Sequence, residues 1–302
     1  MCPDKFSARV ISTTRRYVDI YTSNKEYLRA KTASGLADVY VGDLIEYNLD
    51  DGHYFVTKLI ERKNSFKRSY NKKTKVIATN LDLVLVVAAT EPLFNTQFID
   101  RVLATGAIEN IDCKLIVNKI DTNLDNTEDL IKIYEALGTE VLRVSAQDKI
   151  GMDKINQVLN NPSFNIVALT GISGVGKSTL LNLIIPDADQ RTSEVSEKTG
   201  QGKQTTTQAI AYINKTQSNE EGLLIDLPGI QSFGISNFTE RQIEQGFIEF
   251  RSYSKSCEFN DCLHLAEPNC EVKNAVLKSL ISTSRYDSYL GMIKEIQRFK
   301  EF

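Results

Sequence analysis

Hydrophobic and polar residues alternate along the first sixty residues, in short segments separated by turn-forming residues. Alternation of this kind is typical of strands with one buried face. The segments are 6–11, 17–21, 26–30, 44–47 and 54–60, and Asp50-Asp51-Gly52 indicates a hairpin turn between the last two. Five short strands predict a small antiparallel barrel of the OB type. An SH3-like barrel or an open sheet would give a similar pattern.

The pattern changes near residue 76, where continuous apolar runs replace the alternation. The runs are 83–89, 114–117, 140–144 and 166–169, and helical periodicity separates them at 95–110, 127–138 and 151–159. Apolar runs without alternation indicate strands covered on both faces, and alternating strands and helices predict βαβ units. We therefore expect an α/β domain with a parallel sheet and helices on both faces.

The last part of the chain is predicted to be helical, over 239–253 and 274–299, with a cysteine cluster between the two segments. At 302 residues the chain has room for more than one domain. We expect three: a barrel over 1–72, an α/β domain over 73–234 and a helical domain over 235–302.

Composition narrows the class of protein. The chain is 41% hydrophobic and 25% charged, which is typical of globular proteins. Its strongest apolar run, 81–89, is shorter than the ~20 residues that cross a bilayer. The first residues do not resemble a secretory signal, and five cysteines are too few for a disulfide framework. We expect a cytoplasmic, monomeric enzyme that does not bind membranes.

The net charge of −3 is unevenly distributed. Residues 1–75 carry 15 Lys and Arg against 9 Asp and Glu, whereas residues 76–234 carry 12 against 20. The basic excess concentrates in 58–75, where eight basic residues accompany one acidic residue. The first domain is therefore a candidate for binding nucleic acid although the whole chain is acidic.

A glycine-rich run after the 166–169 strand fits the phosphate-loop pattern G-x-x-x-x-G-K-[ST]. Between a strand and a helix, the backbone N–H groups of such a loop can converge on phosphate oxygens. A chance glycine-rich turn is the alternative, but it would not account for the strand and helix on either side. Lys177 is expected to reach the β- and γ-phosphates as a catalytic residue, and Ser178 to bind Mg²⁺. The expected nucleotide-binding residues here are Gly171, Ile172, Ser173, Gly174, Val175, Gly176, Lys177, Ser178 and Thr179.

A guanine-reading motif, Asn-Lys-x-Asp, precedes the phosphate loop by about fifty residues. It comprises Asn118, Lys119, Ile120 and Asp121 and follows an apolar strand, where parallel sheets bind ligands. The Asp121 carboxylate can accept hydrogen bonds from guanine but not in the same way from adenine. We expect Asn118 to brace neighbouring loops, Lys119 to cover the base, and a backbone N–H of Ser145 or Ala146 to contact the guanine oxygen. Alone, the motif could be a solvated loop.

Two further segments are candidates for sensing the γ-phosphate. Asp226-Leu227-Pro228-Gly229 has the form D-x-x-G, so we expect Asp226 to hold Mg²⁺ through water and the Gly229 N–H to contact the phosphate. In the polar segment 200–207, Thr206 is our candidate for completing the Mg²⁺ shell, although threonine clusters also occur at strand edges. Ile230 follows the motif where many GTPases carry a water-orienting Gln. We therefore expect slow intrinsic hydrolysis, with Gln204 as a catalytic candidate.

A cluster of sulfur and imidazole ligands lies near the carboxyl end. Three thiolates and one imidazole are the donor set of a closed, structural zinc site, in which no position is left for a catalytic water. Buried cysteines beside a surface histidine would be the alternative. The four residues are Cys257, Cys262, His264 and Cys270.

The basic segment 61–75 contains two aromatic residues, Phe66 and Tyr70. Basic residues would neutralise phosphates and the aromatic rings would stack on unpaired bases, if the segment binds nucleic acid. A solvated linker is the alternative.

The order of these motifs, with the guanine reader before the phosphate loop and the metal ligands last, resembles the circularly permuted bacterial GTPases that depend on the small ribosomal subunit. The resemblance covers nearly the whole chain. It implies GTP and GDP as ligands, hydrolysis stimulated by the small subunit and its rRNA, and a role in late subunit maturation. That family usually has His where this chain has Gln204, and an amide cannot take up a proton at neutral pH.

Circular permutation makes the D-x-x-G segment run directly into the metal-binding domain. We therefore expect GTP to fix the arrangement of the outer domains and hydrolysis to release it. Three rivals remain: a GTP-dependent switch that acts on a protein rather than rRNA, an ATP-dependent kinase or ATPase, and an RNA-binding module with a vestigial nucleotide site. Asp121 argues against the second, and intact Lys177, Ser178 and Asp226 argue against the third.

Overall fold

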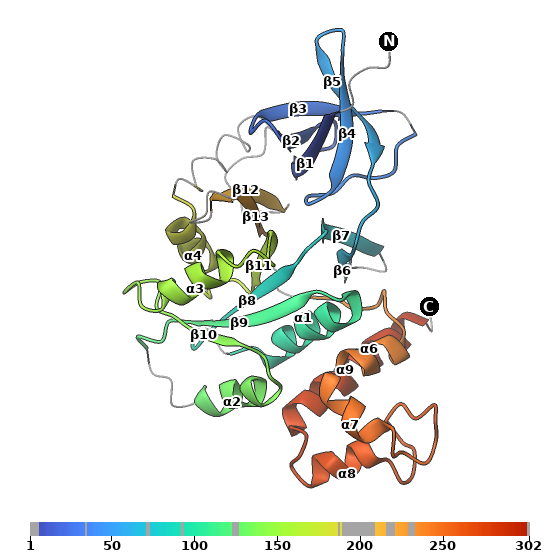
Figure 1. Cartoon of the computed structure of the whole chain (residues 1–302). Coiled ribbons are helices and arrows are strands. Elements are labelled where there is room, and N and C mark those ends of the chain that lie inside the picture. Colours follow the sequence, from blue (N-terminus) through green and yellow to red (C-terminus); the bar gives the residue numbers. More distant parts are fainter. Residues whose placement is uncertain are drawn as a thin grey trace.

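The computed structural model describes residues 6–33, 35–70, 73–91, 94–122, 127–186, 188, 209–215, 221–228 and 233–300. Three bodies follow one another in Figure 1: a barrel at the top, an α/β sheet in the middle and a group of helices below it. In the described residues no helix is long and apolar enough to cross a membrane.

The barrel contains five strands in the closed order β1-β2-β3-β5-β4, as predicted. Neighbouring strands are antiparallel except β3 and β5, which pair in parallel. Its interior is filled by small and branched side chains from alternate positions, which explains the alternation in the sequence. The strands are β1 (Phe6–Thr13), β2 (Val18–Thr22), β3 (Tyr27–Thr32), β4 (Leu44–Asp50) and β5 (His53–Leu59).

A hairpin follows the barrel, formed by β6 (Ser65–Tyr70) and β7 (Lys73–Thr79). The basic segment is thus largely strand rather than linker. We predicted the first domain to end at residue 72, which lies between these two paired strands. The division into domains stays a prediction.

The central sheet has six strands in the order β10-β9-β8-β11-β13-β12. Five are parallel, and the edge strand β12 pairs antiparallel with β13. Side chains that alternate along β8 enter two different cores, one on each face of the sheet. The strands are β8 (Leu83–Ala89), β9 (Asp112–Asn118), β10 (Val141–Arg143), β11 (Ile166–Gly171), β12 (Ile210–Lys215) and β13 (Glu221–Asp226).

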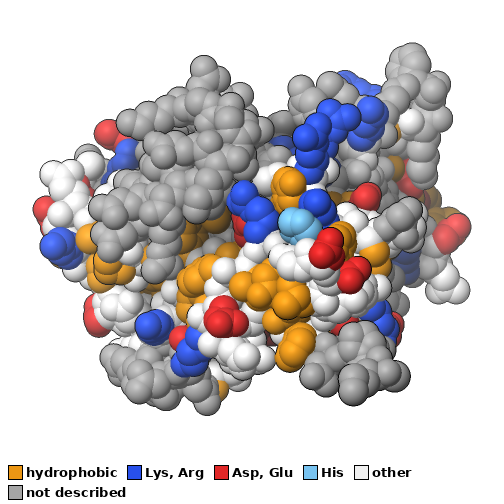
Figure 2. Space-filling model, turned by 90° about the horizontal axis from the view of Figure 1, so that it is seen from above, with side chains coloured by type: hydrophobic (Ala, Val, Ile, Leu, Met, Phe, Trp, Pro, Cys, Tyr) orange, Lys and Arg blue, Asp and Glu red, His pale blue; other side chains and the backbone are white. Residues whose placement is uncertain are grey.

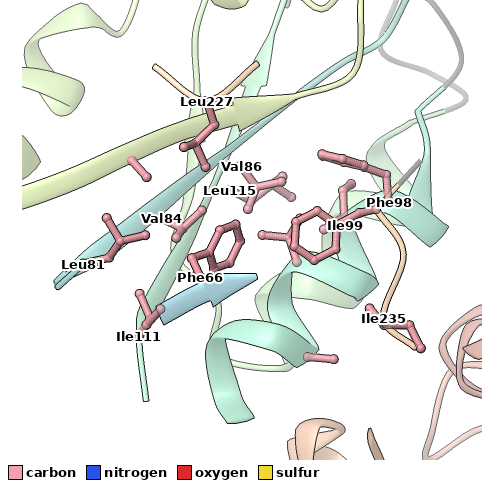
Figure 3. Packing of buried hydrophobic residues seen from close by; sticks show 14 of the residues in the cluster. Phe66, Leu81, Val84, Val86, Phe98, Ile99, Ile111, Leu115, Leu227 and Ile235 are labelled. Atoms are coloured by element: carbon pink, nitrogen blue, oxygen red, sulfur yellow. The ribbon is translucent and has the colours of Figure 1, made fainter. Parts of the chain in front are cut away.

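Helices cover both faces of this sheet, as predicted. The core on one face includes residues of α1 (Thr96–Glu109) and α2 (Glu128–Ala136), and the core on the other includes residues of α3 (Met152–Leu159) and α4 (Lys177–Ile184). Figure 3 shows the first core, where Val84, Val86 and Leu115 of the sheet face Phe98 and Ile99 of α1.

The carboxyl-terminal helices are shorter than the periodicity suggests. The predicted 239–253 helix is α6 (Glu240–Gly246), a 3-10 turn η1 (Ile248–Phe250) and α7 (Arg251–Ser254), because Phe247 leaves the helical conformation with ψ at 85°. The predicted 274–299 helix is α8 (Glu271–Leu277) and α9 (Thr283–Lys300), separated at Ser279 by a positive φ of 57°. The prediction of two continuous helices was wrong, although the prediction that this part of the chain is helical was right.

Candidate nucleotide and metal sites

The phosphate loop joins the end of β11 to the start of α4. Gly174 and Gly176 have φ of 88° and 87°, a left-handed conformation that glycine adopts without steric cost. Lys177 is the first helical residue, and the exposed side chains of Ser178 and Thr179 follow it. The opening N–H groups of a helix have no partner within it and carry its positive dipole end. This end of β11 therefore suits an anionic ligand.

Asn118, at the end of β9, connects two loops of this site. Its Nδ2 donates to the carbonyl oxygen of Val175 at 2.9 Å, and its Oδ1 accepts from the backbone N–H of Ala146 at 2.9 Å. The side chain is buried, so both hydrogen bonds lie away from solvent. These bonds hold the predicted guanine reader against the phosphate loop, although Asn118 and Val175 are 57 residues apart in the chain.

In the rest of the Asn-Lys-x-Asp motif, Lys119 and Ile120 are half-buried and Asp121 is exposed. Lys119 has a φ of 64° and donates from Nζ to the carbonyl oxygen of Glu91 at 2.7 Å. The N–H of Ile120 donates to Val144 at 3.2 Å, which ties the motif to the next strand end. The Asp121 carboxylate is exposed and has no hydrogen-bond partner in the described residues, so it is available to a ligand.

The backbone N–H groups of Ser145 and Ala146, one of which we expected to face the guanine oxygen, already donate to acceptors within the protein. The N–H of Ser145 donates to Ile150 at 3.0 Å, and that of Ala146 donates to Asn118. A ligand oxygen would have to share the Ala146 N–H. The next residue, Gln147, is exposed, and its N–H has no acceptor within the described part of the chain. Sequence reasoning missed Gln147 because a backbone donor leaves no signal in residue type.

Lys177 and Asp226 meet although they come from motifs 49 residues apart. Lys177 Nζ donates to Asp226 Oδ1, and both side chains are buried. Burial raises the pKa of the Asp226 carboxyl, and the adjacent ammonium of Lys177 opposes that rise. The structure therefore brings the D-x-x-G aspartate to the phosphate loop.

Oxygen donors suited to Mg²⁺ lie at this end of the sheet. Mg²⁺ prefers carboxylate, hydroxyl and phosphate oxygens, and Asp226 and Ser178 supply the first two kinds. The remaining candidates lie outside the described residues: Gln204 for the water, Thr206 for the Mg²⁺ shell and Gly229 for the γ-phosphate. Ile230, which stands where many GTPases carry a water-orienting Gln, lies outside them too.

The sulfur and imidazole ligands gather as predicted. The donor atoms of Cys257, Cys262, His264 and Cys270 all lie within 4.8 Å of one another. His264 Nδ1 is 3.3 Å from the sulfurs of Cys262 and Cys270 and 3.7 Å from that of Cys257, and Cys257 and Cys270 are 3.9 Å apart. Zinc bonds of about 2.3 Å to sulfur and 2.0–2.1 Å to nitrogen place tetrahedral ligands at nearly these separations. The cluster could hold one zinc ion.

A second group of side chains orients this cluster. His264 Nε2 lies 3.4 Å from Glu244 Oε1, on the ring side opposite the sulfurs, and both residues are buried. Tyr286 and Tyr289 of α9 each donate a hydroxyl, at 2.6 Å, to the backbone oxygens of His264 and Leu263. The sequence spacing identified the ligands but not Glu244, because no fixed spacing relates α6 to the cluster.

The basic segment differs from our expectation at Phe66. We expected its ring to stack on an unpaired base, but Phe66 is fully buried and its ring centroid lies 5.3 Å from that of Phe233. Figure 3 shows the ring among core residues of the sheet and α1. The stacking role for Phe66 was wrong, because the alternation of β6 turns this side chain inward. The Tyr70 side chain lies outside the described residues.

The basic side chains of this segment divide into two groups. Arg62 is paired with Asp43 at 2.7 Å, Lys63 with Asp82, and Lys67 with Glu109 at 4.0 Å. Arg68, Lys73 and Lys75 have no ion pair with any described residue. Figure 2, which views the molecule from the barrel end, shows Lys and Arg side chains gathered near the centre of the face.

Comparison with known proteins agrees with this geometry. The family described as RsgA GTPase matches residues 59–236. A small ribosomal subunit biogenesis GTPase RsgA of Flavobacterium johnsoniae is 38% identical over 89% of this chain and 85% of its own length.

Two solved structures cover almost the whole chain. YjeQ from Thermotoga maritima aligns with 97% of this chain and 99% of its own, at 28% identity and a TM-score of 0.75. YloQ, a circularly permuted GTPase, aligns with 97% of this chain and 96% of its own, at 24% identity and a TM-score of 0.71. The permuted motif order, the fold and these similarities agree, and the chain belongs to the RsgA family of GTPases.

Proposed function

We propose that this chain binds the small ribosomal subunit and hydrolyses GTP to GDP and phosphate during late subunit maturation, with hydrolysis stimulated by the subunit. The observation that carries the proposal is the pair of hydrogen bonds made by Asn118. They hold the guanine-reading loop against the phosphate loop, so one nucleotide can contact both. The relatives' name supports the biological role.

In this proposal each residue has a defined task. Asp121 accepts hydrogen bonds from guanine, while N–H groups of the loop from Gly171 to Thr179 hold the phosphates. Lys177 moves from Asp226 to the β- and γ-phosphates and neutralises the charge that develops on them. Ser178 directly and Asp226 through water would hold Mg²⁺, which would supply a positive charge against the phosphate oxygens. Thr206 remains the candidate for completing the Mg²⁺ shell, Gly229 for contacting the γ-phosphate and Gln204 for positioning the water.

We assign the cysteine and histidine cluster to one structural zinc ion. All four donors come from the protein, so the ion stabilises the loop 257–270 and leaves no position for water. We also propose that the protein is a cytoplasmic monomer, consistent with a role on ribosomal subunits.

The test is GTP turnover by purified protein with and without purified small ribosomal subunits. We expect slow turnover alone and at least about a tenfold increase with subunits, equal to about 1.4 kcal/mol of lowering of the activation barrier. Turnover of ATP at the same rate would contradict the guanine assignment. An Asp121→Asn variant should prefer xanthosine triphosphate, because the amide reverses one hydrogen bond to the base.

The rival is a GTP-dependent switch that acts on a protein. This rival predicts that subunits stimulate GTP turnover equally well whether or not their ribosomal RNA surface is accessible. Equal affinity of subunits for the GDP-bound and GTP-analogue-bound protein would contradict the idea that hydrolysis releases the subunit.

A further inference from the structure

The guanine-reading motif ends in a β-turn over 119–122, and Asp121 is the third residue of that turn. The N–H of Thr122 donates to the carbonyl oxygen of Lys119 at 3.0 Å, which closes the turn. Lys119 has a φ of 64°, a left-handed conformation that is strained for a residue with a Cβ atom. The Asp121 carboxylate is exposed and has no hydrogen-bond partner in the described part of the chain, so the backbone of this turn sets where it lies.

Two threonine hydroxyls hold the carbonyl oxygen of Lys119. Thr122 Oγ1 donates to this oxygen at 2.8 Å. Thr90 Oγ1 lies 2.5 Å from Thr122 Oγ1 and 3.3 Å from the same carbonyl oxygen. Because a hydroxyl donates only one hydrogen atom, the two shorter distances favour a relay in which Thr90 donates to Thr122 and Thr122 donates to Lys119. Both threonines are half-buried, so water has limited access to the relay.

The relay joins the turn to a different loop of the sheet. Thr90 directly follows β8 and is 32 residues from Thr122 in the chain. Strands β8 and β9 are parallel neighbours whose last residues pair with each other, and this register brings Thr90 beside the turn. The residue after Thr90 also contacts the motif, because Lys119 Nζ donates to the carbonyl oxygen of Glu91 at 2.7 Å. The loop after β8 therefore holds both the backbone and the side chain of Lys119.

We propose that Thr90 and Thr122 are positioning residues for guanine recognition. Their hydroxyl relay holds the turn so that the Asp121 carboxylate accepts hydrogen bonds from the guanine N1–H and 2-amino groups at the same time. The inference rests on the proposed function, in which the ligand is a guanine nucleotide. Phosphates are bound by a different loop, so loss of the relay acts on recognition of the base and not on recognition of the phosphates.

The test compares wild type with a Thr90→Val/Thr122→Val variant, which removes both hydroxyls and keeps the branched shape of the side chains. Both changes are needed, because after Thr122→Val alone the Thr90 hydroxyl can donate directly to Lys119. Affinities are measured for GDP, for inosine diphosphate, which lacks the 2-amino group, and for ADP, which lacks the N1–H as well. Wild type should prefer GDP to inosine diphosphate by at least about tenfold, the effect of one hydrogen bond to a charged group.

The loss in the valine variant should follow the number of hydrogen bonds that each base makes to Asp121. We expect affinity to fall at least about tenfold for GDP, about threefold for inosine diphosphate and not at all for ADP. A Thr90→Ser/Thr122→Ser variant keeps both hydroxyls and should keep the wild-type preference for GDP. The control is Thr139→Val, which changes a half-buried threonine before β10, at the end of the sheet opposite the nucleotide site. It should leave all three affinities unchanged.

Two results would overturn the inference. An equal loss of affinity for all three nucleotides would show that the threonines only support the fold of the site, and an unchanged preference for GDP would show that they do not position Asp121. Hydrogen exchange of the nucleotide-free protein provides an independent measurement, since the Ile120 and Thr122 N–H groups should exchange faster in the valine variant. Equal binding of the three nucleotides by wild type would contradict the proposed function, while the exchange rates would still decide whether the relay holds the turn.

Discussion

A Cβ atom added to Gly176 would lie 2.3 Å from Nδ2 of Asn118. The phosphate loop and the guanine-reading motif are therefore in contact so close that only glycine fits between them. We predict that Gly176→Ala weakens GTP binding by at least about tenfold, or about 1.4 kcal/mol, because Asn118 must move and release Val175. Binding of a fluorescent GTP analogue measures the loss.

Gly138 provides the matched control for this substitution. It has a similar φ of 80°, but a Cβ there would meet nothing within 4 Å. Gly138→Ala thus introduces the same backbone strain without the clash, about 1–2 kcal/mol in stability, and should leave GTP affinity unchanged. Equal losses of affinity in both variants would show that strain alone explains the effect.

Asn118→Asp tests the same contact between the two loops in another way. The carboxylate keeps an acceptor for the Ala146 N–H but faces the Val175 carbonyl oxygen without a hydrogen atom to donate. Leaving a buried acceptor unpaired costs about 1–3 kcal/mol, so we expect lower thermal stability together with weaker GTP binding. Hydrogen exchange at the phosphate loop should accelerate in this variant. Unchanged exchange there would mean that Asn118 does not hold the loop.

The sequence predicted those elements whose burial leaves a recognisable pattern of apolar residues. The apolar runs of β8 and β11 are covered on both faces, so they were recognisable as strands of a buried sheet. β12 was not among the predicted strands, and its antiparallel direction leaves no mark on the sequence, because an antiparallel edge strand has the same local pattern as a parallel one. Phe66 was misread for a related reason. Basic neighbours suggested a solvent-facing ring, whereas strand alternation turns it into the core.

Candidate site residues also divide into those that a local sequence pattern reveals and those that it does not. Asn118, Lys177 and Asp226 belong to motifs whose spacing is typical of nucleotide sites, so the sequence could nominate them, and the structure places Asn118 and Asp226 in contact with the phosphate loop. Glu244 acts through His264, which is distant in the chain. Its role depends on which elements pack together, and no residue spacing encodes that.

Glu244→Ala should weaken zinc binding by about 10- to 100-fold, the usual effect of losing a carboxylate that orients a metal-binding histidine. Glu244→Gln keeps an acceptor for His264 Nε2 and should recover most of the affinity. Competition with a chromophoric chelator measures the affinity, and the Co²⁺ spectrum of the substituted protein reports the ligand geometry. Asp261→Ala removes an exposed carboxylate beside Cys262 and serves as control. A similar loss in that control would assign the effect to overall charge.

Glu221 connects the barrel to the sheet and makes this contact sensitive to pH. It accepts from the Tyr21 hydroxyl at 2.7 Å and pairs with Lys25 at 3.2 Å. The hydrogen bond from the Tyr21 hydroxyl, helped by Lys25, holds the pKa of Glu221 below its usual value, although burial acts in the opposite direction. A lowered folded-state pKa means that the stabilisation is complete above the unfolded-state value, about 4.3. It is lost as the pH falls through the lower, folded-state pKa.

We therefore predict that Glu221→Gln lowers the melting temperature at pH 7 and that its difference from wild type shrinks below about pH 4. Thermal unfolding across this pH range measures the effect. Glu140→Gln, which removes an exposed partner of Lys114 on the sheet, should not change the barrel's behaviour. A difference between wild type and Glu221→Gln that stays constant with pH would contradict the assignment.

Arg285 of α9 joins the carboxyl-terminal helices to the sheet domain through buried ion pairs. Its Nη1 donates to Asp100 of α1 at 2.8 Å, its Nε donates to Glu249 at 2.8 Å, and its guanidinium lies 4.4 Å from the Phe247 ring centroid. Arg285→Ala leaves buried carboxylates unpaired, so we expect a loss of about 3–5 kcal/mol in the free energy of unfolding. Urea titration measures it.

The comparison for Arg285 is Arg143, which also pairs with two carboxylates, Glu128 and Glu135, but at the surface. Arg143→Ala should cost less than about 1 kcal/mol, because water solvates the charges that remain. An Arg285→Met/Asp100→Asn variant should recover part of the loss, since it removes one buried charge together with its partner. Equal losses for Arg285→Ala and Arg143→Ala would show that burial does not set the strength of the contact between α9 and α1.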